Sequence, residues 1–235
     1  MNTATHQELT APAEQLLIAA ERLLAEKGLG AVSVREIARA AGQKNHSAIS
    51  YHFGSIENLI DAILSYRMLP LNVKRAKRLE QWRHAGRTSD LRGLVQVLVE
   101  PFADELLQPP EQSYYLRLLA QLMSQRQWQP LFTEHPVRAS AILETGELMA
   151  DILRPIMGEE IALERLRLMG LHMLNTITEW DAVRRRGDLR HCLASLCSPY
   201  FCSHLLLSLS AAVCGNHRGR AAISCSRLQG CFHKA

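Results

Sequence analysis

Long apolar runs are missing from this chain of 235 residues. The longest, near residues 205–213, is far shorter than the ~20 residues that a membrane-spanning helix needs. The N-terminal stretch MNTATHQELTAPAEQ is polar and lacks the apolar centre of a secretion signal. We therefore expect a cytoplasmic protein with no membrane partner.

Glycine turns and alternating β-branched runs are also scarce, which argues against a sheet protein. Leucine, alanine, arginine and glutamate dominate instead, and many segments repeat apolar residues at the helical spacing of three and four. The expected fold class is all-α. The length suffices for one small and one medium domain, each with its own core.

Motifs that carry catalysis or bind cofactors are absent as well. The chain has no glycine-rich phosphate loop, no H-E-x-x-H pair and no G-x-S-x-G elbow. Its carboxylates are spread along helix faces rather than clustered. We therefore expect no enzyme, no catalytic residue, no bound metal and no cofactor.

Residues 33–53, SVREIARAAGQKNHSAISYHF, predict two short helices joined by a turn. Ser33 and Glu36 have the spacing of a capping box at the start of the first helix. Gly42 can supply the positive φ that a tight turn needs. The apolar residues of the first helix fall on one face: Val34, Ile37, Ala38 and Ala41.

The second helix has little apolar surface. Only Ile49 and Phe53, four residues apart, are expected to point to the core. The other side chains are polar and would face outward: Lys44, Asn45, His46, Ser47, Ser50, Tyr51 and His52. Such a division is typical of a helix-turn-helix, whose second helix enters the DNA major groove.

Residues 10–68 as a whole resemble the N-terminal DNA-binding domain of TetR-family transcriptional repressors. The resemblance rests on the segment IARAAG at 37–42, the segment YHF at 51–53 and the two flanking helices. The first flanking helix would end at Gly28, and the second would begin at Ser55. The resemblance implies a three-helix helix-turn-helix domain, followed by a helical domain for ligand binding and dimerisation.

Two features depart from the family pattern. The stretch from Gly42 to Tyr51 is one residue longer than the commonest spacing, so the turn or the helix start is expected to differ. Ile56 stands where the family often has a lysine that contacts phosphate. Neither change affects the expected fold.

The resemblance also implies which residues contact DNA. Tyr51 and His52 would meet the phosphate backbone, as would Ser33 at a helix N-terminus. Arg35 is also predicted to bind DNA. The residues placed to read bases, with Asn suited to adenine and Lys to guanine, are Lys44, Asn45, His46, Ser47 and Ser50.

A run of basic residues without an intervening acid follows this domain. It admits two interpretations: a solvated helix face, or added attraction for the DNA backbone. Its members are Arg67, Lys74, Arg75, Lys77 and Arg78.

Residues 69–190 are expected to form the helical effector-binding and dimerisation domain. The apolar periodicity predicts helices over about 90–107, 111–127, 137–154 and 160–186. The last of these carries a polar stripe at helical spacing: His172, Asn175, Thr176 and Glu179. The stripe either faces solvent or a subunit interface, or orients a small-molecule effector in an apolar pocket.

The composition changes abruptly near the C-terminus. No acidic residue follows Asp188, and every cysteine lies after residue 191: Cys192, Cys197, Cys202, Cys214, Cys225 and Cys231. Their spacing lacks the paired motifs of a zinc site, and a reducing cytoplasm disfavours disulfides. We predict an atypical Cys/His-rich extension over residues 191–235, which would alter or replace the closing dimerisation helix of the family.

These observations lead to one main hypothesis. The protein would be a homodimeric transcriptional regulator, most simply a repressor that binds a palindromic operator in double-stranded DNA and is released by a small-molecule effector. The alternative is a thiol- or metal-responsive sensor that acts through the Cys-rich tail. A third possibility is a DNA-binding protein that responds to no effector.

Overall fold

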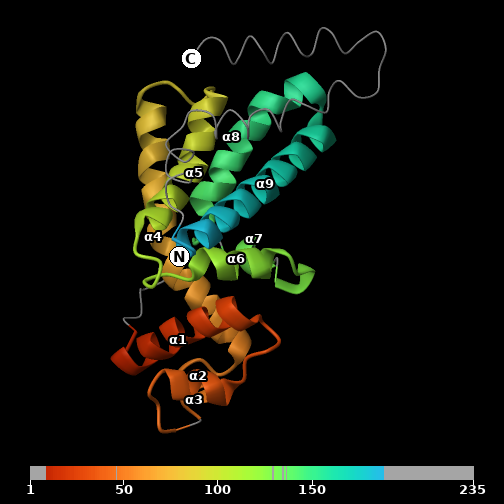
Figure 1. Cartoon of the computed structure of the whole chain (residues 1–235). Helices are drawn as coiled ribbons and strands as arrows, with labels where there is room; N and C mark the ends of the chain where they lie inside the picture. The colour runs from red at the N-terminus through yellow and green to blue at the C-terminus, as the bar shows by residue number, and fades with distance from the viewer. Residues whose placement is uncertain (1–8, 46, 129, 134, 136, 188–235) are drawn as a thin grey trace. The chain divides into compact units, whose positions relative to one another are not determined.

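The computed structural model describes residues 9–187 except 46, 129, 134 and 136, and throughout this part of the chain the regular elements are helices (Figure 1). The all-α class predicted from the sequence is therefore confirmed. None of the helices in these ranges combines the length and the apolar character needed to cross a membrane. The chain divides into two compact units, and the first takes residues up to 68 together with 113–134.

The first unit begins with the predicted helix-turn-helix. Its helices are α1 (Ala11–Lys27), α2 (Val34–Ala40), α3 (Ala48–His52) and the first part of α4 (Ile56–His84). Helix α2 packs against α1 and contacts α3. Apolar side chains fill the space between them, and the most deeply buried are Leu16, Leu17, Leu24, Ile37, Ile49, Leu59 and Ile63.

Short sequence signals fix the ends of these helices. Gly28 ends α1 with a φ of 99°, a value that a residue with a Cβ rarely adopts. The Ser33 hydroxyl accepts a hydrogen bond from the Glu36 N–H (3.2 Å), and the Ser55 hydroxyl accepts one from the Asn58 N–H (3.1 Å). Both predicted serine caps are confirmed. The Glu36 carboxylate also forms an ion pair with Lys27.

The first unit also contains a segment from much later in the chain. This segment holds α6 (Tyr115–Met123), the 3₁₀ helix η1 (Arg126–Trp128) and α7 (Pro130–Thr133). Helix α6 packs on α1. It begins four residues later than the expected start at 111, because Pro109 and the Gln112 N–H form a turn first. The sequence assigned these residues to the second domain, whereas their contacts group them with the first unit.

The second unit is built from the rest of α4 with α5 (Leu91–Leu107), α8 (Ser140–Met157) and α9 (Glu159–Arg185). Helices α5, α8 and α9 lie side by side and share one apolar core (Figure 1). The helices predicted over 90–107, 137–154 and 160–186 are all present, with ends displaced by at most three residues.

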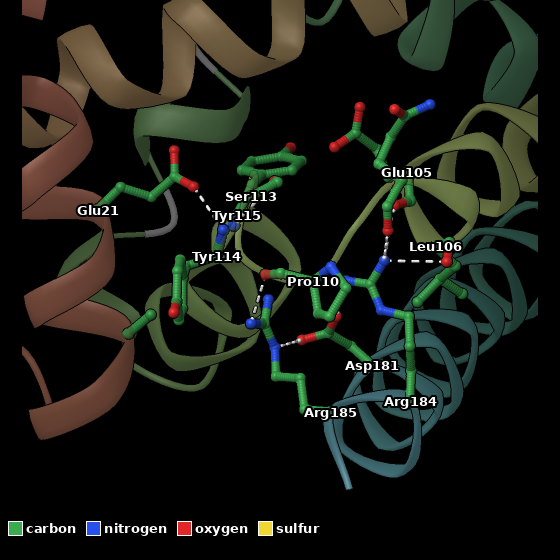
Figure 2. A network of polar contacts seen from close by, with 12 residues as sticks. Glu21, Glu105, Leu106, Pro110, Ser113, Tyr114, Tyr115, Asp181, Arg184 and Arg185 are labelled. Atoms are coloured by element: carbon green, nitrogen blue, oxygen red, sulfur yellow. Dashed lines mark hydrogen bonds and ion pairs between the residues drawn. The ribbon is translucent and has the colours of Figure 1, made fainter. Parts of the chain in front are cut away.

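A buried charge cluster on α9 secures the end of α5 (Figure 2). Asp181 is 1% exposed and accepts hydrogen bonds from Arg184 and Arg185. Arg184 donates in turn to the carbonyl oxygens of Glu105 (3.1 Å) and Leu106 (2.9 Å). Both carbonyls lie in the last turn of α5, and that of Glu105 also accepts a hydrogen bond from the Gln108 N–H (3.2 Å). The Arg184 cation adds a charged donor there and complements the negative end of the helix dipole.

Candidate nucleic-acid interface

The turn between α2 and α3 is built on Gly42, whose φ is 68°. The Gln43 N–H donates to the Ala38 carbonyl (2.9 Å) and the Gly42 N–H donates to the Arg39 carbonyl (3.1 Å). This pair of hydrogen bonds is the Schellman arrangement, which requires a left-handed residue after the helix. The turn predicted at Gly42 is therefore present.

Helix α3 is shorter than the sequence suggested, because the chain is still in a turn at Lys44 and Asn45. The Asn45 side-chain oxygen accepts a hydrogen bond from the Ser47 N–H (2.9 Å), and the Asn45 carbonyl accepts one from the Ala48 N–H (3.2 Å). Asparagine often caps a turn in this way. Three predicted base-reading residues, Lys44, Asn45 and Ser47, thus precede the helix, whereas His46 lies outside the described residues.

Helix α3 presents most of its surface to solvent. Ala48 and Ile49 are buried and hold it against the unit, while Ser50 is exposed and Tyr51 is 84% exposed. The ring of Tyr51 meets the half-buried ring of His52 edge-on, with centroids 4.9 Å apart. An exposed aromatic residue beside exposed hydroxyl groups gives hydrogen-bond donors and an apolar contact surface without weakening the core.

The N-terminal part of α2 adds positive charge to the unit. Ser33 and Arg35, two of the residues predicted to contact DNA, are both exposed. A hydrogen bond from Lys27 is the main cause that lowers the pKa of the Glu36 carboxyl, which therefore stays charged and paired. The sequence reasoning missed Arg39, an exposed residue one turn after Arg35 on the same helix face. The i, i+4 spacing of the two arginines was the available signal.

Most side chains of the basic run that follows make contacts within the same chain. Arg67 pairs with Glu21 (2.7 Å), Lys74 pairs with Asp104 (3.1 Å) and Arg78 pairs with Glu100. A fourth member, Arg75, is 1% exposed and lies over the ring of Phe102, 4.6 Å from its centroid. These contacts favour a structural role for the run over attraction for DNA.

The polar stripe on α9 lies on the surface of the second unit. His172, Asn175 and Glu179 are exposed, and Thr176 is half-buried. The Thr176 hydroxyl donates to the carbonyl of His172 in the preceding turn (2.9 Å). The stripe continues the exposed apolar residues Ile161 and Leu168 along the same helix. This position fits the interpretation of a solvent or interface stripe.

The Cys-rich tail lies outside the residues that the structure describes, so the predictions for residues 191–235 stay predictions. In the described ranges, no group of His, Cys, Asp and Glu side chains could hold a metal ion.

Comparison with known proteins gives one match by sequence. Residues 16–63 match the sequence model of a family described as bacterial regulatory proteins, tetR family. These residues run from the middle of α1 to the early part of α4 and include the whole helix-turn-helix. No curated protein matches the chain.

Two solved structures match the chain over most of its length. One is native NalD of Pseudomonas aeruginosa, described as the secondary repressor of the MexAB-OprM multidrug efflux pump; it is 22% identical, with a TM-score of 0.52 over 81% of this chain and 95% of that chain. The other is a transcriptional regulator of Rhodococcus sp. Rha1, 21% identical, with a TM-score of 0.46 over 87% of this chain and 96% of that chain. At 22% sequence identity, the likeness to NalD shows a similar fold and nothing further.

Proposed function

We propose that the chain is a TetR-family repressor that binds a palindromic operator as a homodimer, and the match of residues 16–63 to the family model supports this proposal. The observation that carries the proposal is helix α3, which two buried residues attach to the unit and which exposes Ser50 and Tyr51 to solvent. NalD, which shares the fold, is described as a repressor, and repression is the mode we propose here.

The proposed contacts with DNA divide into two sets. Tyr51, His52, Ser33 and Arg35 contact phosphates and position the domain on the duplex. Base edges are read by residues that precede α3 in the chain and by one on its exposed face, namely Lys44, Asn45, His46, Ser47 and Ser50. The first set gives affinity for any DNA, and the second set gives preference for the operator.

The proposed dimer uses the exposed face of α8 and α9. Large apolar side chains are exposed there in the single chain: Leu143 is 49% exposed, Ile161 is 50% exposed and Leu168 is 44% exposed. Three such side chains on two neighbouring helices are best explained by a partner that covers them. A second copy would place two α3 helices in successive major grooves of a palindromic site.

The proposed signal is a small-molecule effector that binds the second unit. Effector binding would favour a conformer in which the two α3 helices no longer match the groove spacing, so the complex would dissociate from the operator. The stripe of His172, Asn175, Thr176 and Glu179 is the proposed site of effector or subunit contact. If a His172→Ala variant responds to the effector as the wild type does, His172 is not part of the effector site.

The test is a mobility-shift titration of the purified full chain on the DNA upstream of its own gene, against random competitor at fixed salt. Specific retardation that a small molecule relieves supports the whole proposal. Specific retardation that no small molecule relieves leaves a DNA-binding regulator without an effector. Equal binding of upstream and random DNA would contradict operator recognition at that site.

A further inference from the structure

A buried carboxylate lies inside the unit that carries the helix-turn-helix. Glu21 is in the middle of α1 and only 1% of it is exposed. A carboxylate removed from water is costly unless donors surround it. Arg67 on α4 provides two of them, with Nε 2.7 Å from one Glu21 oxygen and Nη2 3.1 Å from the other.

The third donor comes from a distant part of the sequence. The backbone N–H of Tyr114 donates to the Glu21 oxygen at 2.6 Å, across a separation of 93 residues (Figure 2). Tyr114 is the N-cap residue of α6, and its own side chain makes no capping hydrogen bond. The N-terminal N–H groups of a helix need acceptors, and a negative charge there is favourable. Glu21 therefore caps α6 from another helix.

Helix α6 has a second polar attachment to α1 and a broad apolar one. The Gln121 side-chain amide donates to the Ala25 carbonyl at 2.9 Å, one helical turn beyond Glu21 on α1. Five of the nine residues of α6 are buried, and α6 packs on α1. The capped N-terminus and this packing together fix the helix at two points along α1.

Glu14 offers a natural comparison on α1. Its carboxylate accepts a hydrogen bond from the Tyr66 hydroxyl (2.9 Å), so it links α1 to α4 as Glu21 does. Burial and this hydrogen bond raise the pKa of Tyr66 and keep its hydroxyl protonated as the donor. Glu14 is seven residues before Glu21, on the same helix face. Unlike the contact of Glu14, that of Glu21 also includes the N-terminus of α6.

We propose that the DNA-binding unit of this protein is discontinuous in sequence: residues 113–134 complete it, and Glu21 is the positioning residue that holds them there. This inference rests on the proposed operator binding. Helix α1 supports α2, and α2 supports α3. The capped α6 thus braces the frame on which α3 is presented, although neither Glu21 nor α6 is among the residues proposed to contact DNA.

Three variants of the full chain test the proposal. Glu21→Gln removes the negative charge and leaves the half-buried Arg67 without this anion, so it is paired with the double variant Glu21→Leu/Arg67→Met, which removes both charges together and protects the fold. Glu14→Gln is the matched control. Each variant is measured by operator titration, by amide hydrogen exchange over residues 113–123 and by circular dichroism, all well below its unfolding temperature.

The proposal predicts faster exchange over 113–123 and an operator Kd raised about tenfold in both Glu21 variants, the equivalent of one lost charge-assisted hydrogen bond. Glu14→Gln should change the operator Kd less than threefold and leave the exchange over 113–123 unchanged. A folded double variant with faster exchange and wild-type operator affinity would overturn the proposal, as would wild-type exchange in both Glu21 variants. Wild-type protein without any operator preference would instead overturn the proposed function, and the exchange data would still report whether Glu21 holds α6.

Discussion

Individual residues in the turn before α3 have roles that residue type alone does not reveal. The sequence suggested Asn45 as a reader of adenine, because an asparagine amide can donate and accept at once. In the structure its side-chain oxygen already accepts the Ser47 N–H, so the residue also shapes the start of α3. The sequence indicates which residue types stand in the DNA-binding segment. Whether one of them reads a base or stabilises the turn of the protein backbone depends on contacts that only the structure shows.

Two substitutions separate these roles for Asn45. Serine can cap the same turn through its hydroxyl, whereas alanine cannot. If Asn45 mainly shapes the turn, Asn45→Ala should weaken operator binding roughly three- to tenfold, the range of one lost neutral hydrogen bond, and Asn45→Ser should restore it. If it reads adenine, both variants should lose about 1–3 kcal/mol at a single base pair of the operator. A titration against operators with single base changes distinguishes the two outcomes.

Tyr51 allows a cleaner substitution because it is 84% exposed and contributes little to the core. Tyr51→Ala should lower the affinity for operator and random DNA by similar factors, since a phosphate contact carries no sequence information. The unfolding temperature should stay within about 2 °C of the wild type, because exposed substitutions rarely exceed about 0.5 kcal/mol. A loss confined to the operator would reassign Tyr51 to base reading.

At the scale of helices, local signals predicted the elements well and their packing poorly. The serine caps at 33 and 55 and the glycine ends at 28 and 42 each act within a few residues, so sequence reveals them. The late starts of α3 and α6 depend on turns that compete with the helix. One attachment of α6 to α1 is the hydrogen bond between Tyr114 and Glu21, 93 residues apart, and no local pattern indicates such a pairing.

One close helix contact in the second unit gives a stability prediction. A Cβ added to Gly93 on α5 would lie 2.7 Å from the indole of Trp82 on α4, which is too close for real atoms. Gly93→Ala should therefore destabilise the protein by about 1–2 kcal/mol despite the better helix propensity of alanine. Gly146 on α8 has no atom within 4 Å of such a Cβ, so Gly146→Ala should stabilise by about 0.5–1 kcal/mol. Urea unfolding of both variants checks the opposite signs, and a stable Gly93→Ala protein would contradict the packing.

For the whole molecule, the family resemblance predicts the helix-turn-helix and gives no detail of the second unit. Sequence predicted its helices from periodicity, but the exposure of the α9 stripe follows from how α5, α8 and α9 pack. The single chain leaves apolar residues of α8 and α9 in solvent, so the complete regulator is proposed to be larger than one chain.

Dimerisation through α8 and α9 is tested by placing a charge on that face. Leu168→Glu should shift the protein toward monomers in sedimentation velocity and weaken operator binding at least tenfold, because a buried carboxylate at a subunit contact is costly. Leu107→Glu is the matched control, since Leu107 is 60% exposed and lies on α5. Equal effects of the two variants would remove α8 and α9 from the proposed interface.

The central claim is sequence-specific DNA binding by a symmetric dimer, and its most direct measurement is selection of bound duplexes from a random-sequence library by the full-length protein. The account predicts an enriched palindrome with half-site centres about 10 base pairs apart or a multiple of that spacing. It also predicts that Ser50→Ala relaxes the preference at symmetric positions in both half-sites. A library that stays random after selection, or an enriched motif without two-fold symmetry, would contradict the account.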